Sequence, residues 1–245
     1  MQLSENWFVD APWAQLLCST KIPNDTLQKF IAMSDDILEE SDGKGTEEVV
    51  PSSWEVSIER FQKFGVLDYT MNTINEYMST VLSNGNVKQM MDTEISDGPH
   101  TQWNSRIVHA WVVSQKENDY IPVHAHDKGD NQTESSKISG ILYLKVPEQI
   151  ERNTNDIAIR GGKDGQIVFT GMGGADSFST TTALNIIPEA GRLYLFPSSL
   201  NHQVYPFRGK GERRSLSFNA DVISKKQVDV IVEQEKNTQE NVEGI

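Results

Sequence analysis

The chain has little of what disulfide-linked, membrane-spanning or secreted proteins need. Its 245 residues include one cysteine, Cys18, which excludes an internal disulfide and a zinc site built from several cysteines. No apolar run approaches the roughly 18–20 residues of a transmembrane helix. Residues 1–17 contain no basic segment and no continuous apolar stretch, so we expect no secretory signal peptide. Together these absences predict a cytoplasmic protein without a membrane partner.

Basic residues are scarce relative to acidic ones. The 22 Lys and Arg residues face 35 Asp and Glu residues, which gives a formal net charge of −13 at pH 7. Non-specific affinity for nucleic acid comes mainly from Lys and Arg that neutralise phosphates. The composition therefore argues against nucleic acid as a partner, and solubility is the simplest explanation of the acidic excess.

The first hundred residues favour helices. Asn24-Asp25-Thr26 is a typical helix start, and apolar residues continue the helical period to Leu38. A second apolar period runs from Val66 to Leu82 and ends near Asn84-Gly85. We therefore expect residues 1–100 to form a helical or irregular elaboration that packs on a separate core.

After about residue 107 the pattern changes to short strands separated by turn residues. Such a pattern predicts a mainly β fold, a sandwich or barrel of which the jelly roll is one form, with the N-terminal helices over one outer face. We expect the core to span residues 101–222 and residues 223–245 to form a charged tail or short helix. The strands that carry the candidate site are Tyr120–His126, Ser139–Val146, Gly191–Pro197 and Arg213–Asn219.

Histidine is also rare, and three of the five histidines form a pattern. Side chains at positions i and i+2 of a strand point to the same face, so His124 and His126 can converge on one metal ion. His202 follows a strand end and turn and can supply a third ligand from across the barrel. Three protein ligands on one side of a metal leave positions open for substrate and oxygen, as in non-heme Fe(II) oxygenases.

The identity of the third ligand has three interpretations, because such enzymes usually supply two histidines and one carboxylate. His126 can itself bind the metal, Asp127 or Asp130 can supply a carboxylate, or His126 can stand behind the ligands while water completes the site. We favour His126 because the i, i+2 geometry needs no distortion. In a regular strand Asp127 would point to the opposite face.

An Arg-x-Ser pattern follows the third histidine. Arg213 and Ser215 share one strand face, and Arg214 points away. An arginine holds a carboxylate through two parallel hydrogen bonds, and a nearby hydroxyl can add a third. An arginine inside a barrel is costly unless it is paired, which favours a bound dicarboxylate. Pairing of Arg213 with a protein carboxylate such as Glu212 is the alternative.

Four ordered motifs lie between residues 103 and 220: His124-Ala125-His126, Ser139-Gly140-Ile141-Leu142-Tyr143, Phe196-Pro197-Ser198-Ser199-Leu200-Asn201-His202 and Glu212-Arg213-Arg214-Ser215-Leu216-Ser217-Phe218-Asn219. These motifs resemble those of the Fe(II)/2-oxoglutarate-dependent oxygenases. In particular, the chain looks like the small oxygenases of this superfamily that are frequent in marine phages and bacteria. The resemblance implies a double-stranded β-helix (jelly-roll, cupin-like) fold and bound Fe(II). It also implies oxidative decarboxylation of the co-substrate 2-oxoglutarate to succinate and CO2, coupled to hydroxylation of a substrate by O2.

The resemblance also implies roles for individual residues. The metal site would consist of His124 and His202, with His126 in the place of the usual acidic ligand. The 2-oxoglutarate site would consist of Arg213 and Ser215, with Tyr120 and Tyr143 as further pocket candidates. Segments 127–137 and 171–182 read as loops, which often carry substrate contacts. A phage-encoded member would act in the host cytoplasm.

Two other functions fit the same residues. One is a cupin-like module that binds a metal or ligand without catalysis. The other is a three-histidine metal dioxygenase that does not use 2-oxoglutarate. The residues do not select among a prolyl or other amino-acid side chain, a small metabolite and a nucleobase as the substrate, although the acidic charge disfavours the nucleobase.

Overall fold

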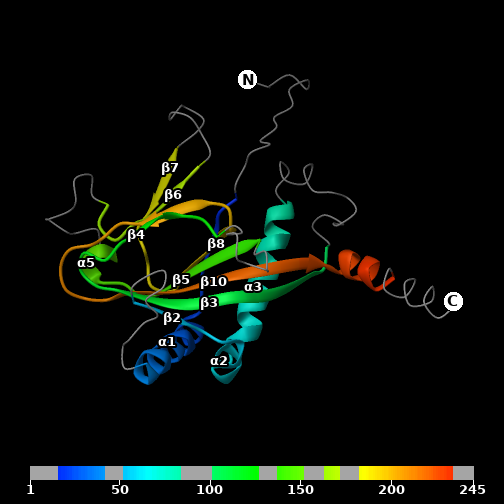
Figure 1. Ribbon diagram of the computed structural model, residues 1–245, viewed down its shortest axis with the longest axis horizontal. Coiled ribbons are helices and arrows are strands. Elements are labelled where there is room, and N and C mark those ends of the chain that lie inside the picture. The colour runs from blue at the N-terminus through cyan, green and yellow to red at the C-terminus, as the bar shows by residue number, and fades with distance from the viewer. Residues whose placement is uncertain are drawn as a thin grey trace, which may run out of the picture.

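The computed structural model describes residues 16–41, 52–83, 101–126, 137–151, 163–171 and 182–233. These residues form two antiparallel sheets with helices on one side (Figure 1). The major sheet has the strand order β1-β8-β5-β10-β3-β2, and the minor sheet has the order β4-β9-β6-β7. The strands are β1 (Cys18–Lys21), β2 (Ser53–Glu55), β3 (Trp103–Gln115), β4 (Ile121–His124), β5 (Ile138–Lys145), β6 (Ile167–Thr170), β7 (Ala183–Ile186), β8 (Arg192–Pro197), β9 (Asn201–Val204) and β10 (Arg213–Ser224).

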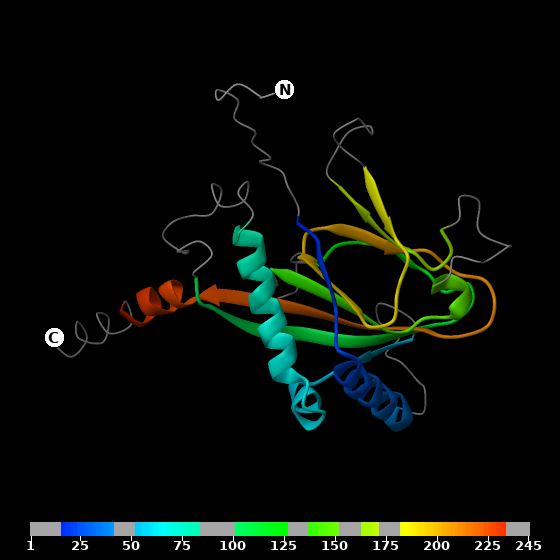
Figure 2. The same cartoon turned by 180° about the vertical axis from the view of Figure 1, so that it is seen from behind.

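Helices cover the outer face of the major sheet. Figure 2 shows α1 (Asn24–Glu40), α2 (Ile58–Lys63) and α3 (Leu67–Ser83) on the side of this sheet that faces away from the minor sheet. A short helix, α5 (Glu148–Glu151), follows β5. Alternate residues of β10 face the helices and bury apolar surface, which is the main stabilising contribution at this interface. This first core cluster includes Leu216, Phe218 and Ala220 of β10 together with Phe30, Met33 and Ile37 of α1.

A second, smaller core lies between the two sheets. On β5, Leu142 and Leu144 belong to the helix-facing cluster, whereas Ile141 and Tyr143 belong to the cluster between the sheets. Successive side chains of a strand point to opposite faces, so β5 is apolar on both sides and has no exposed face. The same alternation on β10 directs its odd-numbered residues toward the space between the sheets, where the candidate site lies.

The N-terminal region contributes more than the expected helices. β1 pairs with β8 and β2 pairs with β3, so both edges of the major sheet come from the first hundred residues. These strands leave no periodic signal in the sequence because they have only 4 and 3 residues. At the other end, residues 225–233 are helical. Among the helices of the described ranges, none has the length and apolarity needed to cross a bilayer.

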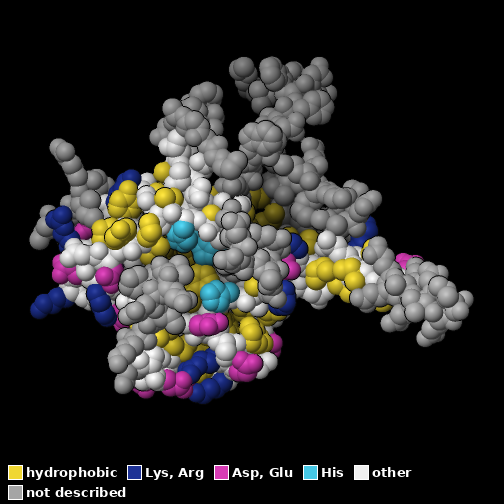
Figure 3. Space-filling model, in the orientation of Figure 1, with side chains coloured by type: hydrophobic (Ala, Val, Ile, Leu, Met, Phe, Trp, Pro, Cys, Tyr) yellow, Lys and Arg dark blue, Asp and Glu magenta, His cyan; other side chains and the backbone are white. Residues whose placement is uncertain are grey.

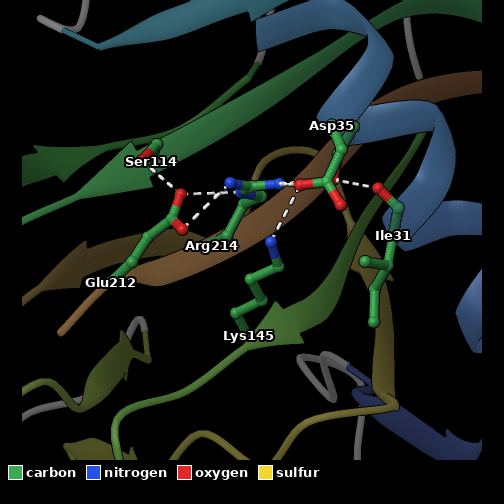
Figure 4. Close-up of polar contacts among 7 residues, drawn as sticks. Ile31, Asp35, Ser114, Lys145, Glu212 and Arg214 are labelled. Atoms are coloured by element: carbon green, nitrogen blue, oxygen red, sulfur yellow. Dashed lines mark hydrogen bonds and ion pairs between the residues drawn. The ribbon is translucent and has the colours of Figure 1, made fainter. Parts of the chain in front are cut away.

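An ion-pair network joins α1 to the major sheet (Figure 4). Arg214 is 5% exposed and donates to Asp35 and Ser34 of α1. Its Nε lies 2.7 Å from Glu212 Oε1, and Lys145 Nζ lies 2.8 Å from Asp35 Oδ1. Arg214 therefore points to the helix side, as expected, and Glu212 pairs with Arg214 rather than with Arg213.

Candidate metal centre

Three histidine side chains meet where β4 and β9 pair. His124 ends β4, His202 lies on β9, and their Cα atoms are register partners. One nitrogen from each of His124, His126 and His202 lies within 4.8 Å of the other two. Figure 3 shows histidine side chains gathered around a hollow on one face of the molecule, with apolar side chains visible inside it. Three nitrogens at this separation are close enough to hold one metal ion.

Backbone carbonyls fix the tautomers of two of these histidines. His124 Nδ1 lies 2.8 Å from Pro122 O, and His202 Nδ1 lies 3.0 Å from Leu200 O. A carbonyl oxygen only accepts hydrogen bonds, so each Nδ1 must carry the proton and donate it. Each Nε2 is left with a lone pair, which is the state that a metal ligand requires.

His126 reaches the site by a different route from the one expected. β4 stops at His124 and is irregular in register between Ile121 and His124, so strand alternation does not place His126. Instead the backbone N–H of His126 donates to Ser198 O at 2.8 Å. The ring stacks on Trp111, with centroids 5.4 Å apart, and on His202 at 5.1 Å. The alternative ligands Asp127 and Asp130 lie outside the described residues.

Burial keeps two of the histidines neutral. Desolvation, with a smaller contribution from the adjacent His124, lowers the pKa of His126 to about 4. The same two causes lower the pKa of His202 to about 3. Both rings are therefore uncharged at neutral pH, and only the neutral imidazole binds a metal.

A buried arginine lies on the inner face of β10, at its start. Arg213 is 1% exposed; it donates to Gln115 and, through Nη2 at 3.1 Å, to the Tyr143 hydroxyl. Its guanidinium lies over the Tyr143 ring at 4.9 Å, and its Nε is buried without a hydrogen-bond partner. No carboxylate of the described residues forms an ion pair with it. A buried cation in this state fits a carboxylate ligand.

Ser215 and Tyr143 flank this arginine, as the sequence analysis expected. Both are buried, and their Cα atoms are register partners across β10 and β5. Burial raises the pKa of Tyr143 more strongly than Arg213 lowers it, so the hydroxyl keeps its proton. The sequence analysis missed Gln115. It is the register partner of Arg213 on β3, and such a pairing becomes visible only once the strand order is known.

Tyr120 does not join the cluster. It precedes β4, and 64% of its surface is exposed. Its assignment to the pocket assumed a regular strand from Tyr120 to His126, and the irregular register before His124 removes that basis.

Comparison with known proteins agrees with this fold. Residues 109–219 match the family model described as "Putative 2OG-Fe(II) oxygenase". The fold is similar to that of a Pseudomonas putida prolyl-4-hydroxylase (TM-score 0.50, 14% identity, covering 83% of this chain and 91% of that one). It is also similar to AviO1 from Streptomyces viridochromogenes (TM-score 0.51, 10% identity, covering 85% and 90%). No curated protein matched the chain.

The paired antiparallel sheets form a jelly-roll fold, and the histidine cluster fits iron binding. Residues 109–219, which include the three histidines and the buried arginine, match the Fe(II)/2-oxoglutarate-dependent oxygenases. The expected fold class, enzyme class and superfamily are thereby confirmed.

Proposed function

We propose that this oxygenase binds Fe(II) through His124, His126 and His202 and 2-oxoglutarate through Arg213. The observation that carries the proposal is the combination of three convergent imidazole nitrogens with one buried guanidinium that pairs with no carboxylate in the described part of the chain. Bound iron and 2-oxoglutarate would activate O2 and be responsible for hydroxylating the substrate, with release of succinate and CO2. We also propose residues 101–222 as the catalytic core, residues 1–100 as its elaboration, residues 223–245 as a C-terminal tail or short helix, and a cytoplasmic location.

The residues around Arg213 would hold the distal carboxylate of 2-oxoglutarate. The Arg213 Nε–H finds no acceptor among the described residues and can donate to a ligand oxygen. Tyr143 accepts from Arg213, which leaves its own hydroxyl proton for a further acceptor. Ser215, two residues further along β10 and on the same strand face, can add a third donor. Three donors around one carboxylate are typical of a site that selects a dicarboxylate by charge and geometry.

Apolar side chains enclose the space between these groups and the histidines. Phe196 packs edge-on against His202, with ring centroids 5.1 Å apart, and Phe169 packs edge-on against Phe196 at 4.9 Å. Ile141 and Tyr194 belong to the same cluster. A wall of this kind excludes water and so strengthens the attraction between Arg213 and an anionic ligand.

The experiment is an activity assay of the purified protein with Fe(II), 2-oxoglutarate and O2, in which the succinate formed is measured. We expect His202→Ala to reduce succinate formation to background. His109→Ala is the matched control, because His109 has a half-exposed side chain and lies outside the triad. Full succinate formation by His202→Ala would overturn the proposed metal site.

The same assay distinguishes the proposed function from the two alternatives, a three-histidine dioxygenase and a non-catalytic cupin-like module. A three-histidine dioxygenase would consume O2 without 2-oxoglutarate and would keep that activity in Arg213→Met. A non-catalytic cupin-like module would form no succinate at all. We expect O2 consumption that requires 2-oxoglutarate and is lost in Arg213→Met.

A further inference from the structure

Three buried polar side chains, those of Ser139, Asn219 and Ser198, form a hydrogen-bonded network beside the histidine cluster. Ser139 Oγ lies 2.8 Å from Asn219 Oδ1 and 3.1 Å from Ser198 Oγ. The three residues are 1%, 7% and 2% exposed, respectively. They come from β5, from β10 and from the turn after β8, and Asn219 is the register partner of Ser139. Burying a polar group costs free energy unless the group is hydrogen-bonded, so the hydrogen bonds of this network offset the cost of burying its three side chains.

This hydrogen-bonded network contacts His126 at two points. Ser198 O accepts the backbone N–H of His126 at 2.8 Å. The side chain of Asn219 forms a hydrogen bond with the ring. A neutral imidazole carries one ring proton, and a ring nitrogen that binds a metal must offer its lone pair, so the other ring nitrogen carries the proton and donates it. The amide oxygen of Asn219 is therefore the atom that faces the ring.

Ser139 determines which way the Asn219 amide points. Its hydroxyl donates to Asn219 Oδ1, and Ser198 can donate in turn to Ser139. The oxygen of Asn219 is thus held between two donors, the Ser139 hydroxyl and the His126 ring. A carbonyl oxygen has two lone pairs and can accept both bonds.

This arrangement sets His126 apart from its two partners. Main-chain carbonyls hold His124 and His202, and no side-chain substitution removes such an acceptor. We propose that Asn219, held by Ser139, is a positioning residue that directs one ring nitrogen of His126 toward the metal and thereby sets the metal affinity of the site. The inference rests on the proposed role of His126 as a ligand.

The experiment is titration of metal-free, full-length protein with Co(II), which reports affinity and ligand geometry through its visible spectrum. Asn219→Leu removes the acceptor at nearly constant volume, and we expect it to weaken Co(II) binding by about 10–100-fold, the usual effect of losing a partner of a metal ligand. Asn219→Asp keeps an acceptor oxygen and should bind Co(II) at least as tightly as the wild type. Ser139→Ala leaves Asn219 in place and should give a smaller loss with the same spectral change.

A double-mutant cycle separates positioning from general stabilisation. In a His126→Ala background, Asn219→Leu should cause no further loss of Co(II) affinity. One outcome is that Asn219→Leu lowers the free energy of unfolding of the metal-free protein but leaves the Co(II) affinity and spectrum unchanged. In that case the hydrogen-bonded network only stabilises the fold, and the inference is overturned. Equal losses of affinity with and without His126 would overturn it as well.

Failure of the inference is distinguishable from failure of the proposed function. If His202→Ala binds Co(II) as tightly as the wild type, the proposed metal site is wrong and the inference falls with it. If His126→Ala binds Co(II) as tightly as the wild type, His126 is not a ligand. If both variants weaken binding and Asn219→Leu does not, only the positioning role is wrong.

Discussion

The side chains of Arg213 and Arg214, adjacent in the sequence and both buried, lie on opposite faces of β10. Arg213 contacts Gln115 and Tyr143 between the sheets, whereas Arg214 contacts Asp35 and Glu212 on the helix side. Arg214 is fully ion-paired, and Arg213 pairs with no carboxylate of the described residues. One arginine therefore stabilises the fold, and the other is available for a ligand.

Replacement of Arg213 by methionine should abolish 2-oxoglutarate binding with little loss of stability. A buried guanidinium without an anionic partner carries a desolvation cost, so an apolar side chain of similar length should leave the free energy of unfolding unchanged or higher. In the wild type 2-oxoglutarate should raise the melting temperature by mass action, and in Arg213→Met it should not. Thermal denaturation with and without 2-oxoglutarate measures this difference. If 2-oxoglutarate still raised the melting temperature of Arg213→Met, its binding site would lie away from Arg213.

Replacement of Arg214 by methionine should have the reverse effect. It leaves Asp35 and Glu212 without their shared cation, and we expect a loss of about 3 kcal/mol in the free energy of unfolding. Protein that remains folded should still bind 2-oxoglutarate. Urea denaturation measures the loss, and the Arg213→Met variant serves as the control. A stability equal to that of the wild type would show that the network is energetically neutral.

The Arg214 network should also make stability depend on pH in the acidic range. Burial raises the pKa of Glu212, but hydrogen bonds from Arg214 and Ser114 outweigh it, so the folded-state pKa lies below 4.5. For Asp35 too, hydrogen bonds from Lys145 and Arg214 outweigh burial, and the pKa lies below 3.8. A lowered carboxyl pKa gives stability that is present above the unfolded-state pKa and lost as pH falls through the folded-state pKa.

Glu212→Gln isolates this contribution. The glutamine cannot titrate, so the free energy of unfolding of the variant should fall less steeply than that of the wild type as the pH is lowered below about 4.5. Urea denaturation between about pH 3 and pH 7 gives the two profiles. Parallel profiles would mean that other carboxylates cause the acid sensitivity.

Much of the site was readable from the sequence because its residues lie at short, regular spacings. Arg213 and Ser215 lie on one face and Arg214 on the other, as alternation along a strand requires. The three histidines also converge as their pattern indicated. Local periodicity was sufficient for these inferences because it does not depend on which strands pair.

The remaining features depend on pairing between distant segments. Gln115 faces Arg213 only because β3 lies beside β10, and Asn219 reaches Ser139 only because β5 lies on the other side of β10. His126 reaches the site through a hydrogen bond to Ser198, not through the strand predicted for Tyr120–His126. Register irregularities of this kind leave no periodic signal in the chain.

Replacement of His126 by aspartate should preserve the metal site. The residue stands where related enzymes usually have a carboxylate, so an aspartate can supply an oxygen ligand in place of nitrogen. His126→Asp should therefore bind Co(II) far more tightly than His126→Ala. The alanine variant loses a ligand, so its Co(II) affinity should fall by more than about 100-fold. Co(II) titration of the two variants decides it. Equal weakness of both would show that the backbone here suits an imidazole alone.

Gly140, in the Ser-Gly pair of β5, should tolerate no side chain. A Cβ at this position would overlap the ring of Phe218, its register partner on β10, which is itself 2% exposed. Overpacking of this kind costs about 1–3 kcal/mol, so Gly140→Ala should lower the free energy of unfolding by that amount. The double variant Gly140→Ala with Phe218→Leu supplies the control, because the smaller leucine makes room for the methyl group. Urea denaturation should show that the two losses are less than additive, and strictly additive losses would exclude steric overlap as the reason for glycine at this position.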